Sequence, residues 1–258
     1  LDFKNKKFLF YQPSGRGKLR NPINCAVDTN GDLYVADLGR LEVVVFDKIG
    51  NYLRSFGEKE KFKPGDVLLV GDKIYVSNIT GSKVVVYSKD QENKMLFSFP
   101  SKDDPITSSM GIPINLATYN DKIYVADFGF SKVKIYSLKG DLVDTLGSQG
   151  DGIGQFSKLK GIAIDKEGNL FAVDAAFENM QVFNKEGKLL MALGGHFDGP
   201  GGLILPAKVI VDYDNTEYFK QYVDPAYNLK YLIFVSSQYG PNLINVYGRI
   251  EPKSGPAK

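Results

Sequence analysis

The chain has 258 residues; 43% of them are hydrophobic, and 32 Lys and Arg against 30 Asp and Glu leave a net charge of +2. Apolar residues are spread along the whole chain, which favours a substantial folded core over disorder. The balanced charge gives no indication of a nucleic-acid partner. No apolar run approaches the roughly 18 residues of a transmembrane helix. Cys25 is the only cysteine, so an intrachain disulfide is excluded.

One short pattern recurs along the chain. Three apolar or aromatic residues and a small residue precede a polar residue, and an aromatic residue follows nine positions after that polar residue. The copies are residues 33–37, 74–78, 123–127 and 170–174, with a weaker fifth copy at 233–237 that has one extra residue before its aromatic partner. A repeat of this size indicates units that bury their apolar faces by stacking.

Each repeat is predicted to contain four short strands, separated by Gly, Asn and Asp turns. In the first repeat these are residues 23–28, 33–36, 43–46 and 52–56, and Asn30-Gly31 is a hairpin signal between the first two. The second to fourth repeats are predicted to contain strands at 67–70, 74–76, 84–87 and 95–99; at 114–118, 123–125, 133–136 and 142–146; and at 161–164, 170–173, 180–183 and 189–193.

The fifth repeat lacks a fourth strand before the chain ends. Its predicted strands are residues 209–211, 232–235 and 243–247, and residues 7–11 at the N-terminus resemble a fourth strand without the first three. Pairing these two would remove an exposed sheet edge. The sequence therefore predicts one all-β domain over residues 1–250, a β-propeller of five four-stranded blades closed by the N-terminal strand, with a tail at 251–258.

Two connections are longer than a turn. Residues 214–229 interrupt the last repeat and contain Tyr218, Phe219, Tyr222 and Tyr227. Residues 100–113 form the second, which we expect to be a solvated loop over one face.

The first repeat resembles the NHL repeat. The resemblance rests on Asn-Gly-x-Leu-Tyr-Val-Ala-Asp at residues 30–37, followed by Val-Val-Phe-Asp and a last strand ending at Gly57. It covers residues 22–194 and is weaker over 206–248. NHL proteins are β-propellers, usually with six blades, so this chain either forms a five-bladed ring or lacks the inner strands of a first blade; the count of five is favoured.

A closer resemblance lies near the C-terminus. Residues 173–179 and 237–242, with the Tyr-rich insertion between them, are similar to a group of bacterial NHL proteins that are typically exported and encoded beside multihaem c-type cytochromes. The resemblance implies an extracytoplasmic location, periplasmic or extracellular, with the signal peptide already absent. It also implies a multihaem c-type cytochrome as the partner.

The polar residue that ends the second strand recurs as Asp37, Asn78, Asp127 and Asp174. A short carboxylate or amide at this position can accept hydrogen bonds from the turn that follows. A row of such groups around a ring can also bind a cation. The structural role is favoured because the position repeats with the fold.

No catalytic residue, metal site or cofactor is predicted. His196 is the only histidine, and it cannot build a zinc site with Cys25 alone. A Ser–His–acid triad would have to use His196, which lies in a Gly-rich segment without a nucleophile elbow. The glycines of residues 147–154 precede no Gly-Lys-Ser/Thr, so they do not form a phosphate loop, and no Cys-x-x-Cys-His motif for covalent haem occurs.

These observations favour a non-enzymatic scaffold that binds another protein. The expected partner-binding residues are Phe128, Phe130, Phe177 and Tyr239, in the loops after the second strands, together with Tyr218, Phe219, Tyr222 and Tyr227. The four loop aromatics can instead fold inward and cap the sheet ends. Two other functions stay open: a metal-dependent propeller enzyme, lactonase-like or lyase-like, and an RNA-binding NHL domain with a basic face formed by Arg40, Lys59, Lys61, Lys63 and Lys160.

Overall fold

The computed structural model describes residues 12–57, 62–90, 92–101 and 103–253. Nineteen strands in these residues form five antiparallel sheets, which confirms the predicted all-β class and the count of five propeller blades. The residues group into two compact units, 11–160 and 161–258, each described by itself. None of the described helices is long and apolar enough to cross a membrane.

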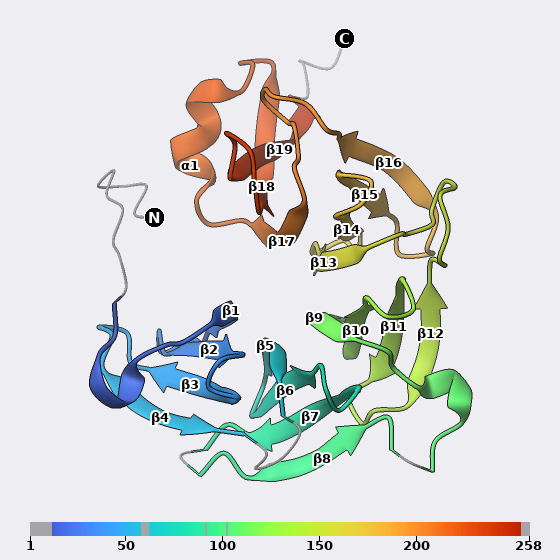
Figure 1. Cartoon of the computed structure of the whole chain (residues 1–258). Coiled ribbons are helices and arrows are strands. Elements are labelled where there is room, and N and C mark those ends of the chain that lie inside the picture. The colour runs from blue at the N-terminus through green and yellow to red at the C-terminus, as the bar shows by residue number, and fades with distance from the viewer. Residues whose placement is uncertain (1–11, 58–61, 91, 102, 254–258) are drawn as a thin grey trace. The chain divides into compact units, whose positions relative to one another are not determined.

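The unit of residues 11–160 contains three four-stranded sheets (Figure 1). The first consists of β1 (Pro22–Val27), β2 (Leu33–Asp37), β3 (Glu42–Phe46) and β4 (Tyr52–Phe56). The second consists of β5 (Pro64–Val70), β6 (Lys73–Asn78), β7 (Lys83–Ser88) and β8 (Met95–Phe99). The third consists of β9 (Pro113–Tyr119), β10 (Lys122–Asp127), β11 (Lys132–Ser137) and β12 (Leu142–Leu146). Two single-turn 3-10 helices, η1 (Gly15–Gly17) and η2 (Ile106–Ser108), lie in its connections.

The unit of residues 161–258 contains the last two sheets. The fourth sheet consists of β13 (Leu159–Ile164), which begins just before the unit boundary, β14 (Leu170–Asp174), β15 (Asn179–Phe183) and β16 (Leu189–Gly194). The fifth has β17 (Pro206–Asp212), β18 (Tyr227–Ser237) and β19 (Ile244–Pro252). The fourth strand predicted for it, at residues 7–11, lies outside the described residues.

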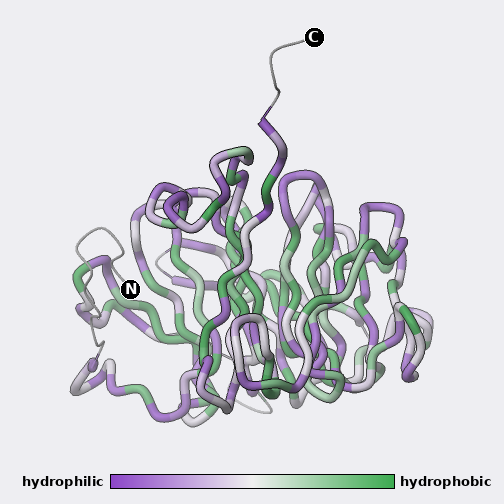
Figure 2. The backbone as a smooth tube through the Cα atoms, turned by 90° about the horizontal axis from the view of Figure 1, so that it is seen from above, coloured by the Kyte–Doolittle hydropathy of each residue, from purple (hydrophilic) through white to green (hydrophobic). Residues whose placement is uncertain are grey.

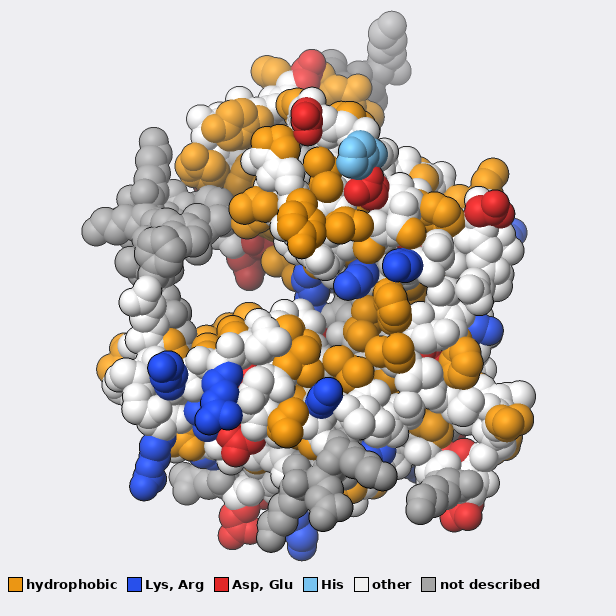
Figure 3. Space-filling model, in the orientation of Figure 1, with side chains coloured by type: hydrophobic (Ala, Val, Ile, Leu, Met, Phe, Trp, Pro, Cys, Tyr) orange, Lys and Arg blue, Asp and Glu red, His pale blue; other side chains and the backbone are white. Residues whose placement is uncertain are grey.

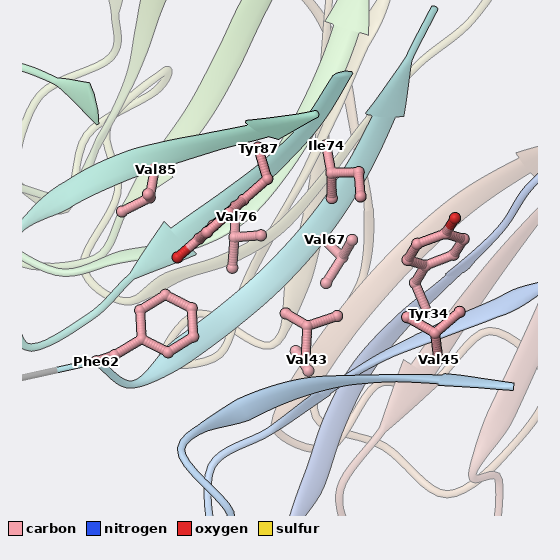
Figure 4. Close-up of a cluster of buried hydrophobic side chains, with 10 residues drawn as sticks. Tyr34, Val43, Val45, Phe62, Val67, Ile74, Val76, Val85 and Tyr87 are labelled. Atoms are coloured by element: carbon pink, nitrogen blue, oxygen red, sulfur yellow. The ribbon is translucent and has the colours of Figure 1, made fainter. Parts of the chain in front are cut away.

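Apolar residues on both faces of the inner strands explain why neighbouring sheets stack. On β3, Val43 and Val45 point into one cluster and Val44 points into another, as the alternation of a strand requires. Figure 4 shows the first cluster, where Val43 and Val45 lie opposite Val67, Ile74 and other buried residues of the second sheet. Figure 2 shows the same division along the chain, with hydrophobic strands and hydrophilic turns.

The fifth sheet differs from its prediction. Its strands are longer than expected, because residues 227–231 continue β18 and pair with residues 249–252 of β19. Tyr227 therefore belongs to a strand, opposite Pro252, and not to a connection. The shorter insertion folds into α1 (Thr216–Phe219) and η3 (Lys220–Tyr222).

The recurrent polar residue ties together the loops at one end of each sheet. Asp127 is fully buried, and its Oδ2 accepts a hydrogen bond from the Gly111 N–H at 2.9 Å. Its Oδ1 accepts from the N–H groups of Ile112 at 3.0 Å, Gly129 at 3.1 Å and Phe130 at 3.3 Å. One carboxylate thus holds both the turn after β10 and the segment before β9.

Asp37, Asn78 and Asp174 occupy the same place and are equally buried. Asp37 accepts hydrogen bonds from backbone N–H groups before β1 and after β2. Asn78 accepts in the same way from N–H groups before β5 and after β6. Asp174 accepts from N–H groups after β14. The predicted structural role of this position is confirmed.

Replacement of Asp127 by Ala is expected to lower the free energy of unfolding by about 2–4 kcal/mol, because several buried N–H groups lose their acceptor. Asp127→Asn is the matched control, since Asn78 fills this place in the second sheet. The Asn side chain keeps the acceptor for the turn and loses only the bond from Gly111, so a smaller loss is expected. Urea unfolding followed by circular dichroism measures both; equal losses in the two variants would contradict this account.

Candidate active site

The turn between β14 and β15 places Glu178 in a left-handed backbone conformation, with φ of 53°. This conformation is uncommon for residues other than glycine. The turns of the first three sheets contain Leu41, Ser82 and Ser131 at the matching position, with φ of 60°, 49° and 49°. The turn geometry therefore belongs to the repeat, and only the side chain is particular to Glu178.

The side chain at this position is hydrogen-bonded to the segment that precedes the first strand of the following sheet. Ser82 Oγ donates to Gly111 O at 2.7 Å, and Ser131 Oγ donates to Ser157 O at 2.9 Å. Glu178 reverses the polarity of this link, because its Oε1 accepts from the Leu205 N–H at 3.1 Å. A carboxylate has a second oxygen, which a serine does not supply.

That second oxygen, Oε2, is hydrogen-bonded to Nδ1 of His196. Only 12% of the Glu178 side chain is exposed, whereas 73% of the His196 side chain is exposed. An ionised carboxylate can only accept, so Nδ1 carries the hydrogen of this bond and Nε2 of the neutral ring is left to accept a proton. Nε2 makes no hydrogen bond to any described residue. The pair is thus a buried carboxylate that orients an exposed imidazole.

The Gly-rich segment that carries His196 is closed by its own backbone. The N–H groups of Phe197 and Leu203 both donate to Gly195 O, at 3.1 and 2.9 Å. Gly194 has φ of 91°, and a Cβ there would lie 2.6 Å from the Leu203 side chain. Glycine is therefore needed for the close approach that brings His196 beside Glu178.

A third loop joins this end of the unit. The Gln238 N–H donates to Leu205 O at 3.2 Å and the Tyr239 N–H donates to Ile204 O at 3.5 Å. Residues 238–239 are therefore bonded to the same segment, 204–205, that donates to the Glu178 carboxylate. In these segments the side chain of Phe197 is 48% exposed and that of Tyr239 is 62% exposed. Figure 3 shows the histidine beside an acidic side chain and among hydrophobic side chains. The site offers a proton acceptor next to apolar surface.

The structure brings together only some of the predicted partner-binding aromatics. Phe177 and Tyr239 lie in loops at the Glu178 end of their sheets. Tyr218, Phe219 and Tyr222 lie at the other end of β17, where they pack on one another and on Phe234 of β18. No measurement tests whether any of them binds a partner, so that role stays a prediction.

Phe128 and Phe130 belong to the other unit, in the turn after β10. Phe128 is half-buried under the Lys160 ammonium, 5.7 Å from the ring centre, and Phe130 lies 5.1 Å from the Lys134 ammonium. Burial lowers the pKa of Lys134, whose ammonium donates to the carbonyls of Thr107 and Ser109. Of the basic residues expected on an RNA-binding face, Lys59 and Lys61 lie outside the described residues, and Arg40 is paired with Glu42.

A metal cage of protein side chains is not found in the described part of the chain. No three His, Cys, Asp or Glu side chains gather there in a group that could hold a metal ion. A metal of the metal-dependent alternative would therefore be held by fewer than three of these side chains. The chemistry available at the site is that of the Glu178–His196 pair.

No model of a protein family and no curated protein matches the chain. Among solved structures, the chain is similar to virginiamycin B lyase from Staphylococcus aureus, in a catalytically inactive histidine-to-alanine variant with quinupristin. The TM-score is 0.61 at 12% identity, over 93% of this chain and 71% of that one. A streptogramin B lyase structure gives a TM-score of 0.57 at 12% identity, over 88% of this chain and 68% of that one.

At this identity the comparison shows the β-propeller fold and not a shared activity. The propeller implied by the NHL resemblance is confirmed, whereas the NHL family itself, the cytochrome partner and the extracytoplasmic location stay predictions.

The expectation of a non-enzymatic protein is wrong on this comparison, because both matched proteins are enzymes with the same fold. That expectation rests on the absence of a catalytic constellation in the sequence and on the aromatic residues in its connections. The structure supplies a partner for His196, 18 residues earlier in the chain. The sequence does carry one signal for it: Glu178 is the only acidic residue at a position where the preceding repeats have Leu41, Ser82 and Ser131.

Replacement of Glu178 by Gln is expected to reverse the tautomer of neutral His196. The Gln amide can still accept from Leu205, but it presents an N–H to Nδ1, which must then accept, and the ring hydrogen moves to Nε2. Because the chain has one histidine, nitrogen-15 NMR of the imidazole reports this site alone. Glu186→Gln, in the exposed turn after β15, is the control and should leave the tautomer unchanged. The same tautomer in wild type and Glu178→Gln would rule out the orienting role.

Proposed function

We propose that this protein is a lyase in which His196 is the general base and Glu178 is its positioning residue. The observation that carries the proposal is the hydrogen bond from Nδ1 of the exposed imidazole to the largely buried Glu178 carboxylate. A neutral imidazole whose Nδ1–H is engaged presents the lone pair of Nε2, which is the group that a general base uses.

The absence of a nucleophile at the pair favours proton transfer over covalent catalysis. Among the described residues, no Ser, Thr or Cys side chain is hydrogen-bonded to His196, as the Ser–His or Cys–His arrangements require. A hydrolase of the triad type is therefore not supported by this geometry. A base without a nucleophile suits the removal of a proton from carbon.

The reaction that fits is an elimination. Nε2 of His196 removes the proton from a carbon next to a carbonyl group, and the electron pair of that C–H bond forms a carbon–carbon double bond. The bond from the neighbouring carbon to an ester oxygen breaks, and a carboxylate leaves. The proton on His196 then returns to solvent. The Glu178 carboxylate stabilises the imidazolium while it carries the second proton.

Two further observations support this proposal. The matched structures are both lyases, and one of them was solved with quinupristin. Phe197, Leu205 and Tyr239, in the segments joined to the Glu178–His196 pair, have exposed side chains, so the substrate is expected to present an apolar group there.

Quinupristin and simple esters with an acyloxy group two carbons from a carbonyl are the test substrates. Elimination within a cyclic ester leaves the mass of the opened product equal to that of the substrate, whereas hydrolysis adds one water, so mass spectrometry separates them. We expect an unchanged product mass from a cyclic ester, an alkene and a carboxylic acid from an open-chain ester, and a loss of about 10²-fold or more in rate for His196→Ala. Glu186→Gln serves as the control with unchanged rate. Addition of water, or full activity of His196→Ala, would reject the proposal.

A further inference from the structure

A cavity of about 610 Å³ lies beside the first sheet, in the unit that does not contain His196. Arg16, Lys18, Arg20 and Arg40 line it, together with Glu42 and Tyr52. Four cationic side chains therefore face one acidic side chain, in a chain whose net charge is only +2. The space is within the range of small-molecule sites, about 300–1,000 Å³.

Arg40 and Glu42 neutralise each other. The Nε and Nη2 groups of Arg40 donate to Oε2 of Glu42 at 3.1 and 2.8 Å. The Arg40 Nη1 group donates to the carbonyl oxygens of Arg16 at 2.6 Å and Lys18 at 3.0 Å. Arg40 is thus a structural cation, and its positive charge balances the negative charge of Glu42.

The side chains of Arg16, Lys18 and Arg20 have no acidic partner among the described residues. All three are exposed, while Gly17 between the first two is buried and Leu19 is half-buried. All three line the cavity, so three positive charges are gathered there without an acidic partner among the described residues.

The backbone that carries these cations is fixed before any ligand arrives. Besides the two bonds from Arg40, the N–H groups of Arg20 and Asn21 donate to the buried Asp37 carboxylate at 2.7 and 2.9 Å. Gly17 packs so closely that a Cβ would lie 2.9 Å from the Phe46 ring. Because the backbone is already ordered, ligand binding costs only the conformational entropy of the side chains.

We infer that this cavity binds a small molecule carrying two or more phosphate groups. Guanidinium groups match the oxygens of phosphate in a bidentate fork, and several cations favour a multiply charged anion over a single charge. Arg16 and Arg20 hold the phosphates by such forks, Lys18 adds a point charge, and Tyr52 forms an aromatic part of the wall. This site is independent of the proposed lyase activity.

Isothermal titration calorimetry with inorganic pyrophosphate tests the inference. We expect saturable binding of one pyrophosphate per chain, weakened at least tenfold in the double variant Arg16→Ala/Arg20→Ala. The matched control is Lys185→Ala/Lys188→Ala, which removes the same charge from an exposed turn of the other unit and should bind like the wild type. Thermal unfolding checks that the variants fold.

Arg16→Lys/Arg20→Lys keeps the charge and removes the fork, and it provides a second measurement should the alanine variant not fold. It is expected to bind more weakly than the wild type. Wild-type strength in the lysine variant would overturn the bidentate contact, and equal losses in the control would overturn the site. No saturable binding of pyrophosphate would overturn the inference outright, as would saturable binding of citrate in its place, which would indicate a carboxylate site.

Discussion

The buried acceptor at the end of each second strand is the interaction on which the loops of this protein depend. In the third sheet one carboxylate receives N–H groups from two separate segments, and the same bonds recur around Asp37 and Asn78. Without it, the turn after the second strand and the segment before the first strand would have no common anchor. A residue in the left-handed conformation follows four positions later in each of the four sheets that carry this anchor.

The candidate active site is built on the fourth example of that anchor. Asp174 binds the N–H groups of Ala176 and Phe177, and the turn then delivers Glu178 to the Leu205 backbone and to His196. All of these contacts are made by the turn after β14 and by the connection between β16 and β17. The chemistry arises from one substitution of a side chain and from a single histidine in the following Gly-rich segment.

The strands could be predicted from the sequence because their signals are local. Short runs rich in Val, Ile, Tyr and Phe, separated by turns with Gly, Asn and Asp, place β1 to β16 within a few residues of their observed bounds. The fifth sheet was predicted less well, since the pairing of residues 227–231 with 249–252 depends on partners far apart and carries no local pattern. The Glu178–His196 pair was missed for the same reason: its members come from separate loops, and only the register of the sheets brings them into contact.

At the matching positions Leu41, Ser82, Ser131 and Glu178, the backbone conformation does not depend on which side chain is present. An apolar residue, an alcohol and an acid all adopt one backbone conformation there, so selection can alter the side chain while the turn stays the same. Such a chain can acquire a reactive group in a single blade while the other copies keep their structural task. A mutation that creates activity then need not first loosen the architecture, and a mutation that removes it leaves a well-folded protein behind.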